Sequence, residues 1–328
     1  MKAVCWQGYG GPEVLTLGDI APPRPGARQV LIKVHAATVT AGDARLRAMD
    51  VAPGFGLPTR LAFGLTKPRR HTPGMEFAGE VAEIGRGVSR FRVGEQVFGT
   101  AGMALGAHAE YLCVDETAVI CQTPANLSHQ QAVAAIFGGL TAIQFLQRKV
   151  SLRPGQRLLI NGASGAVGTS AIQLAKAAGA WVCGVCSSAN TELVRALGAD
   201  EVLNYDTASS GNAPLLHTAK LYPVDFIMDA VGNLTPKSCA HLLGSTGKLI
   251  QLNTGLMGNL WAAINPRLIA GVAAESEADL QLLKTLLGSG KLVPVIDSVY
   301  SLADIASAHR RVDSHRKKGS VVIAVQGR

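Results

Sequence analysis

One segment decides the fold of this chain: Leu158-Leu-Ile-Asn-Gly162-Ala-Ser-Gly165-Ala-Val-Gly168. An apolar, strand-like run enters a loop with three glycines, and the chain leaves the loop with helical periodicity. Such a turn presents backbone N–H groups and the positive end of a helix dipole to an anion. Because glycine makes up 37 of 328 residues, the glycines alone are weak evidence, and the flanking patterns carry the prediction of a dinucleotide site. The predicted cofactor-binding residues of the loop are Gly162, Ala163, Ser164, Gly165, Ala166, Val167 and Gly168.

Composition narrows the class of protein. A chain of 328 residues with 48% apolar and 16% charged residues predicts a folded protein of two domains. The net charge of +8 raises the possibility of nucleic acid, but the basic residues are scattered apart from 67–70 and 310–318, and aromatic residues make up only 5%. A dinucleotide is itself a polyanion, so we expect no nucleic-acid partner.

The cysteines and the apolar stretches predict a cytoplasmic protein. Six cysteines are dispersed, and no signal peptide is recognised at the start, so we expect free thiols in a reducing compartment. Residues 117–147 carry no charged side chain, but proline, histidine, glutamine and a pair of glycines interrupt this stretch. They do not reach the uninterrupted apolar length of about 20 residues that spans a bilayer.

The texture of the sequence changes twice along the chain. Short alternating runs between glycine and proline turns fill the first 120 residues and predict a β-rich domain. From about residue 126, helical stretches (130–149, 170–178, 191–197) alternate with buried strands (158–161, 181–186, 224–229, 247–252), which is typical of a parallel sheet. The tail from about 292 returns to strand character. We therefore predict an α/β protein with a doubly wound Rossmann domain at 126–272, inserted between β-rich residues 1–125 and a C-terminal return at 273–328.

The residues after the second Rossmann strand bear on the choice of cofactor. NAD-preferring domains place an acid about 20 residues beyond the last glycine, where it holds the ribose 2′-hydroxyl. Here the strand is followed by Ser187, Ser188 and Asn190, and no acid occurs until Glu192. Hydroxyl and amide groups are able to donate to a 2′-phosphate, so NADP(H) is favoured. The same residues also suit the cap of the next helix, and both roles are compatible.

Several motifs together resemble a known family. They are Asn161 to Gly168, Leu197-Gly-Ala-Asp200 with Asn204-Tyr205, Asp229-Ala-Val-Gly232, and Gly74-Met-Glu76 near Gly94-Glu-Gln-Val97. In combination they resemble the medium-chain dehydrogenase/reductase superfamily, most closely its zinc-independent quinone oxidoreductase-like branch. The resemblance covers essentially the whole chain. It implies that the β-rich part is a GroES-like catalytic domain and that Tyr205 lines the adenine ribose phosphate pocket.

Departures from the zinc-dependent members predict a metal-free enzyme. Where those dehydrogenases have a cysteine ligand before an aspartate, this chain has Thr40 before Asp43, and their Gly-His-Glu is replaced by Gly74-Met75-Glu76. Cysteine thiolate and histidine nitrogen are the usual zinc ligands, and both are missing here. The cysteine cluster of a structural zinc is also missing near residues 95–115, where only Cys113 occurs.

These features predict an NADPH-dependent transfer of hydride to a quinone or another α,β-unsaturated carbonyl. The candidate catalytic residues are Thr40, as a hydroxyl donor beside the nicotinamide, and Asp43, as the anchor of the Thr40 loop. Thr141 and Asn253 are expected to position the nicotinamide ring, and Lys318 is a further candidate cofactor contact. A zinc-free NADP-dependent alcohol dehydrogenase or carbonyl reductase is the alternative within enzymes. A non-catalytic NADPH-binding sensor or structural protein is the alternative from another class.

Three further segments leave alternatives open. His108 is either a proton donor near the cleft or a structural histidine in a strand. Residues 49–73 are too broken by proline and glycine for one regular helix, and they form either a surface excursion or a mobile lid. The apolar runs 256–264 and 268–272 are expected to form a sheet edge that joins two copies in a homodimer, and the alternative is that Trp261 packs internally.

Overall fold

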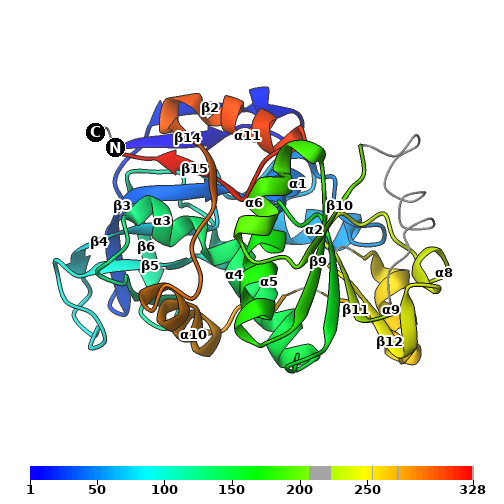
Figure 1. Ribbon diagram of the computed structural model, residues 1–328. Helices are drawn as coiled ribbons and strands as arrows, with labels where there is room; N and C mark the ends of the chain where they lie inside the picture. The colour runs from blue at the N-terminus through cyan, green and yellow to red at the C-terminus, as the bar shows by residue number, and fades with distance from the viewer. Residues whose placement is uncertain (207–222, 253, 272, 327–328) are drawn as a thin grey trace.

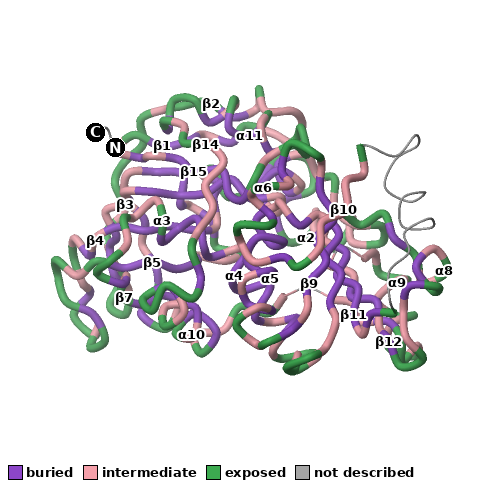
Figure 2. The backbone as a smooth tube through the Cα atoms, in the orientation of Figure 1, coloured by how far each residue is buried: buried purple, intermediate pink, exposed green. Residues whose placement is uncertain are grey.

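The computed structural model describes residues 1–206, 223–252, 254–271 and 273–326 (Figure 1). Within these ranges the strands form a parallel sheet, a mostly antiparallel sheet and a two-stranded ribbon. The predicted α/β class, with a Rossmann-type sheet beside a β-rich part, is confirmed. The buried residues concentrate along the strands of both sheets and the helices between them (Figure 2).

The parallel sheet contains six strands in the described residues, in the order β10-β9-β8-β11-β12-β13. Their bounds are Arg157–Asn161 (β8), Trp181–Cys186 (β9), Glu201–Asn204 (β10), Val224–Asp229 (β11), Leu243–Gln251 (β12) and Leu268–Ile269 (β13). The chain runs outward from β8 to β10 and then returns to β11 on the other side of β8. This reversal places the carboxyl ends of β8 and β11 where sheets of this kind bind ligands.

Two helices follow the first strands of this sheet. Helix α5 (Ala166–Ala177) begins directly after Gly165, one turn before the predicted start at 170. Helix α6 (Thr191–Ala196) agrees closely with the predicted 191–197. The early start of α5 puts its N-terminus at the glycine-rich loop, as a pyrophosphate cradle requires.

The second sheet joins residues from both ends of the chain. Its order is β14-β15-β3-β4-β5-β7, with β6 paired to β3, while β1 pairs with β2. The bounds are Lys2–Trp6 (β1), Leu15–Asp19 (β2), Gln29–Val39 (β3), Glu76–Ile84 (β4), Gln96–Thr100 (β5), Tyr111–Asp115 (β6), Val119–Gln122 (β7), Ile296–Ser301 (β14) and Ser320–Ala324 (β15). Because Val321 pairs with Val39, the C-terminal residues before β15 lie beside Thr40 at the end of β3.

The predicted helix 130–149 is a chain of three shorter ones. They are α3 (His129–Ala134), α4 (Ile136–Ala142) and a π-helix (Ile143–Lys149). Helix α4 packs tightly on α5, since a Cβ added to Gly138 would lie 2.1 Å from the Ala166 carbonyl oxygen. Helix α10 (Glu277–Gly288) crowds the other side, where a Cβ on Gly139 would meet Leu283 at 2.5 Å. The glycine pair that interrupts the sequence pattern therefore permits two close helix contacts.

The apolar run 256–264 does not form a sheet edge, so that part of the prediction is wrong. It forms helix α9 (Leu256–Ile264), and only β13 continues the sheet. Several apolar side chains of α9 are exposed, including Met257 at 75% and Ile264 at 80%. The homodimer stays a prediction.

Residues 49–73 hold one short helix rather than a single regular one. Helix α1 (Ala41–Ala48) ends before the segment, and α2 (Gly56–Phe63) lies inside it. The Leu256 amide at the start of α9 donates to the Pro53 carbonyl oxygen at 2.8 Å, so the segment reaches the helix that follows the parallel sheet. Whether it acts as a lid stays a prediction.

The remaining α-helices of the described residues are α8 (Pro236–Cys239) and α11 (Ile305–Asp313). Helix α11 is fixed to β14 by an ion pair in which Arg311 binds both carboxylate oxygens of Asp297, at 2.6 and 2.8 Å. None of the described helices combines the length and the apolarity that crossing a bilayer requires.

Candidate functional site

The glycine-rich loop has the shape of a cradle. Gly162 has a φ of +84°, and a Cβ on Gly168 would lie 2.2 Å from the Gly162 carbonyl oxygen, so both positions require glycine for the fold itself. Gly165 differs from them, because its backbone is extended and its closest neighbour would be 3.4 Å from an added Cβ. The space beside Gly165 is open, at the N-terminus of α5, where a pyrophosphate is expected to approach.

A buried polar network holds the loop against the neighbouring strand. The Asn161 amide donates to Asp229 at 2.9 Å and to Asn233 at 2.7 Å. The fully buried Asp229 carboxylate also accepts three backbone N–H groups, those of Val231, Gly232 and Leu234. Sequence reasoning quoted these residues only as family motifs, and their positioning role was missed. The signal is the pair of polar residues at the ends of two strands that are otherwise apolar.

The C-terminal segment closes the loop from the other sheet. The Gly319 amide donates to the Ser164 carbonyl oxygen at 2.8 Å, and Gly165 and Gly319 form a bridge. The Lys318 amide is held by Asp297 at 2.7 Å, and its side chain is exposed. Burial lowers the pKa of the adjacent Lys317 to about 8, although the Asp297 and Glu76 carboxylates raise it. Lys318 is therefore placed beside the loop, as its candidate role requires.

The ribose end of the site contains an acid that sequence spacing missed. The Asp206 carboxylate accepts the Ser188 amide at 2.9 Å and the Ser188 hydroxyl at 2.9 Å. These bonds, the one from the amide above all, hold the pKa of Asp206 below its usual range, and the Arg316 guanidinium adds to the effect. In the sequence, no acid occurs between Ser188 and Glu192, but in the structure Asp206 lies beside Ser188. Strands β9 and β10 are paired with Cys186 opposite Asn204, so the residues two positions later also meet.

The other predicted ribose residues lie around the same point. The Asn190 amide nitrogen donates to the Ser164 hydroxyl at 3.0 Å, which ties this turn to the glycine-rich loop. Its oxygen is buried and has no hydrogen-bond partner among the described residues. Ser187 precedes this turn, and Tyr205 follows β10 next to Asp206. Thr141 lies on α4, the helix packed against α5, and Asn253 lies outside the described residues.

Thr40 and Asp43 form a capping box at the N-terminus of α1. The Asp43 carboxylate accepts the Thr40 amide at 2.8 Å and the Thr40 hydroxyl at 2.6 Å. The Thr40 hydroxyl oxygen in turn accepts the Asp43 amide at 3.1 Å. Both side chains are buried, at 5% and 4% exposure. The aspartate therefore orients the threonine, and the threonine proton is shared with the aspartate in this state.

Thr40 and Met75, which stand where the zinc-dependent dehydrogenases have zinc ligands, both lie near Gly42. A Cβ on Gly42 would lie 3.3 Å from the Thr40 hydroxyl oxygen and 3.9 Å from the Met75 sulfur. Burial raises the pKa of the neighbouring Glu76 well above its usual range, and the Asp43 and Glu275 carboxylates raise it further. The Thr38 hydroxyl donates to Glu76 and opposes this rise. Among the described residues, no three His, Cys, Asp or Glu side chains gather in a way that suits a metal ion.

His108 is placed as a structural residue. It is fully buried, and its Nε2 donates to the Thr38 carbonyl oxygen at 2.8 Å. Its ring meets that of His309 edge to face, with centroids 6.2 Å apart. Burial lowers the pKa of His108, so the ring is held neutral. This geometry favours the structural interpretation over proton donation.

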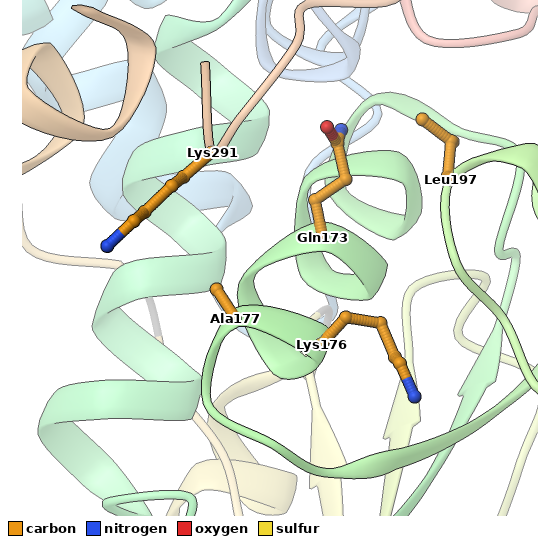
Figure 3. Close-up of a pocket in the computed structure, with 5 residues that line it drawn as sticks. All are labelled: Gln173, Lys176, Ala177, Leu197 and Lys291. Carbon is orange, nitrogen blue, oxygen red and sulfur yellow. The ribbon is translucent and has the colours of Figure 1, made fainter. Parts of the chain in front are cut away.

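A cavity on α5 lies away from the loop. It measures about 320 Å³ and is lined by Gln173, Lys176, Ala177, Leu197 and Lys291 (Figure 3). Lys176 is paired with Asp200, and the Gln173 amide is bound to the Thr169 and Val293 carbonyl oxygens. Figure 3 shows the Lys176 and Lys291 side chains directed apart. Because its lining residues come from α5 and from the segments of Leu197 and Lys291 rather than from the glycine-rich loop, this cavity is not part of the candidate site.

Known proteins match over the whole chain. Residues 26–125 match the alcohol dehydrogenase GroES-like domain, and residues 197–323 match the family described as zinc-binding dehydrogenase. A quinone oxidoreductase of Pseudomonas aeruginosa is 30% identical, with 98% of this chain and 99% of that protein covered.

Solved structures agree in fold. The quinone oxidoreductase of Coxiella burnetii has a TM-score of 0.86 at 30% identity and covers 99% of both chains. An NAD-dependent alcohol dehydrogenase has a TM-score of 0.83 at 27% identity, with 99% of this chain and 100% of that chain covered.

The open space at Gly165 generates a prediction. Gly165→Ala is expected to leave the fold intact, because the backbone is extended and nothing crowds the added Cβ. It should weaken dinucleotide binding by about 1–3 kcal/mol, the scale of hydrogen bonds to a charged group. Calorimetric titration and the unfolding midpoint measure the two effects. Gly8→Ala, where an added Cβ meets nothing within 4 Å, is the control. Unchanged dinucleotide affinity in Gly165→Ala would contradict the placement of the pyrophosphate.

Proposed function

Because the chain belongs to the medium-chain dehydrogenase/reductase superfamily, in its quinone oxidoreductase-like branch, we propose that it reduces a conjugated carbonyl with a nicotinamide dinucleotide and without a metal. The observation that carries the metal-free part is the convergence of Thr40 and Met75 on Gly42. A hydroxyl that is already bonded to Asp43 and a thioether replace the thiolate and imidazole that zinc prefers. The residues present therefore do not fit zinc.

The residues fit a dinucleotide better. The open face of Gly165 leaves room for a pyrophosphate, and the buried, unpartnered Asn190 oxygen is an acceptor for a ribose hydroxyl. Bound NADPH would supply the hydride. The β3–β15 pairing brings Thr40 next to the C-terminal residues that contact the glycine-rich loop. The candidate donor and the proposed cofactor cradle are therefore joined through the same segment.

The absence of a Lewis acid selects the kind of acceptor. Reduction of a simple ketone leaves charge on one oxygen, which zinc would normally stabilise. In a quinone or enone, the hydride adds to the β-carbon and the charge develops on a distant, enolate-like oxygen, for which hydrogen-bond donors suffice. Thr40 is the proposed donor. Its hydroxyl proton, which Asp43 accepts in this structure, must turn to the acceptor oxygen, while the Asp43 carboxylate keeps its bond from the Thr40 amide. Orienting the acceptor near the cofactor would provide most of the remaining rate enhancement.

Two alternatives are compared with this proposal. A zinc-free alcohol dehydrogenase or carbonyl reductase is supported by the likeness to an NAD-dependent alcohol dehydrogenase. A sensor or structural protein would share the dinucleotide cradle and perform no hydride transfer.

The reaction is tested by following NADPH oxidation with a panel of quinones, enones and aldehydes, and NADP⁺ reduction with alcohols. We expect turnover of quinones and enones, weak activity on simple aldehydes, and no loss after treatment with a chelator. The reverse ranking would favour alcohol dehydrogenase chemistry. Dinucleotide binding without turnover of any acceptor would favour the sensor, and loss of activity on chelation would contradict metal independence.

We further propose that the cofactor is NADP(H). The Ser188 amide and hydroxyl, the exposed Lys318 and the Arg316 guanidinium beside Asp206 are donors or cations suited to a 2′-phosphate. Asp206 opposes it, since its carboxylate occupies the Ser188 donors and repels a phosphate. The 2′-phosphate must therefore displace Asp206 from Ser188.

Asp206→Asn is expected to tighten NADPH binding about fivefold, because a like charge at contact distance costs about 1 kcal/mol in water. NADH affinity should change little. Glu192→Gln removes the same charge from an exposed site on α6 and is the control. Titration of the wild-type protein with both cofactors decides the preference itself. NADH binding that is equal to or tighter than NADPH binding would refute it.

Thr40→Val is expected to lower kcat about 100-fold, the scale of losing one oxyanion donor. Dinucleotide affinity should be nearly unchanged. The substitution also removes an N-cap worth about 1 kcal/mol of stability, so the unfolding midpoint is measured alongside. Thr40→Ser keeps the hydroxyl and should retain most of the activity. Equal losses in the two variants, or an unchanged kcat in Thr40→Val, would remove Thr40 from the reaction.

A further inference from the structure

A second cavity is lined by two arginines for which the described part of the chain offers no ion-pair partner. It measures about 410 Å³ and is lined by Ala62, Phe63, Arg69, Arg70 and Met103. Phe63 is buried, whereas both arginines are exposed. Among the described residues, no carboxylate pairs with Arg69 or Arg70, although Arg47, Arg148 and Arg311 each bind an aspartate. The cavity therefore combines an apolar wall with uncompensated positive charge.

The backbone that presents these arginines is held firmly. The Tyr9 hydroxyl donates to the Gly64 carbonyl oxygen at 2.8 Å, and Arg60 donates to the Leu65 carbonyl oxygen at 2.6 Å. The Arg69 amide donates to the Phe63 carbonyl oxygen at 2.7 Å. Gly64 has a φ of +130°, and a Cβ there would lie 2.0 Å from the Lys67 carbonyl oxygen, so the turn requires glycine. A fixed turn with unpaired charged ends is preorganised for a ligand.

The turn that carries Met103 is hydrogen-bonded to the segment that carries Met75. Met103 lies in the turn after β5, and in the same turn the Ala101 amide donates to the Met75 carbonyl oxygen at 2.7 Å. The Met75 side chain faces Thr40 across Gly42. An acceptor whose reactive carbons lie at Thr40 would extend along Met75 toward Met103 and the two arginines.

We propose that this cavity is a subsite for an anionic group, carboxylate or phosphate, at the far end of the conjugated carbonyl substrate. Guanidinium groups bind both anions through paired N–H donors, and the apolar wall suits the carbon chain between the anion and the reactive centre. Glu275 is the nearby acid, but its carboxylate lies beside Gly102 and accepts the Thr100 hydroxyl. Burial raises the pKa of Glu275 above its usual range. The subsite rests on the proposed function, and it defines the substrate class as acidic.

The test compares an enone carboxylic acid, its methyl ester and a matched phosphate monoester at low ionic strength. We expect kcat/KM for the anionic acceptors to exceed that for the ester. Arg69→Gln/Arg70→Gln should lower this preference about tenfold by raising KM for the anionic acceptors. This is the scale of charge-assisted bonds at an exposed site. Rising salt should have the same effect on the wild type. The larger loss identifies carboxylate or phosphate as the natural anion.

The matched control is Arg86→Gln/Arg92→Gln. It removes the same two charges from the turn between β4 and β5, which projects on the left in Figure 1, away from α2. An equal loss in both double variants would assign the effect to net charge and overturn the subsite. Equal turnover of acid and ester by the wild type would overturn it as well.

Calorimetry separates this proposal from the proposed function. The saturated carboxylate analogue, which accepts no hydride, should bind the wild type about tenfold more tightly than Arg69→Gln/Arg70→Gln. If no acceptor is turned over but this difference appears, the anion subsite stands and the reductase proposal fails. If neutral enones are turned over without any difference in analogue binding, the reductase proposal stands and the subsite fails.

Discussion

The hydrogen bond from the Gly319 amide to the Ser164 carbonyl oxygen holds the candidate site together, because it joins the two sheets at the glycine-rich loop. Its geometry depends on Gly319, whose φ is +62° and whose added Cβ would lie 2.1 Å from the Val295 carbonyl oxygen. The next residues enter β15, which pairs with β3 just before Thr40. This backbone contact thus helps to fix the loop proposed to receive a dinucleotide relative to the residue proposed to serve the acceptor.

Burial shifts the ionisable groups near Thr40. It raises the pKa of Glu76 well above its usual range and lowers that of Lys317 to about 8. Asp43 is satisfied within the capping box of Thr40. A carboxylate that stayed charged and unpaired here would oppose the negative charge that develops on an enolate-like oxygen. The burial of Glu76 and the capping box of Asp43 thus both limit unpaired negative charge beside Thr40.

The sequence predicted most where a pattern is local. Strands β8, β9 and β11 are mostly apolar because both faces of a parallel sheet are covered, and this signal needs no knowledge of the fold. The glycine-rich loop was found for the same reason. The run 256–264 was misassigned because short apolar runs fit a strand or a helix equally, and α9 keeps much of its apolar surface exposed.

What the sequence could not provide are contacts made across strands and between sheets. Asp206 meets Ser188 only because β10 lies beside β9 in that register, which a count of residues along one strand does not reveal. Likewise, the sequence shows Arg69 and Arg70 only as part of a basic run. The structure shows that they line a cavity together with Met103. The two cases have opposite consequences: at the ribose end a carboxylate fills the donors that a phosphate would need, while at the acceptor end the donors face a cavity with no carboxylate to fill them. In these two proposals, a phosphate at the ribose end competes with Asp206, whereas an anion at Arg69 and Arg70 meets no paired carboxylate among the described residues.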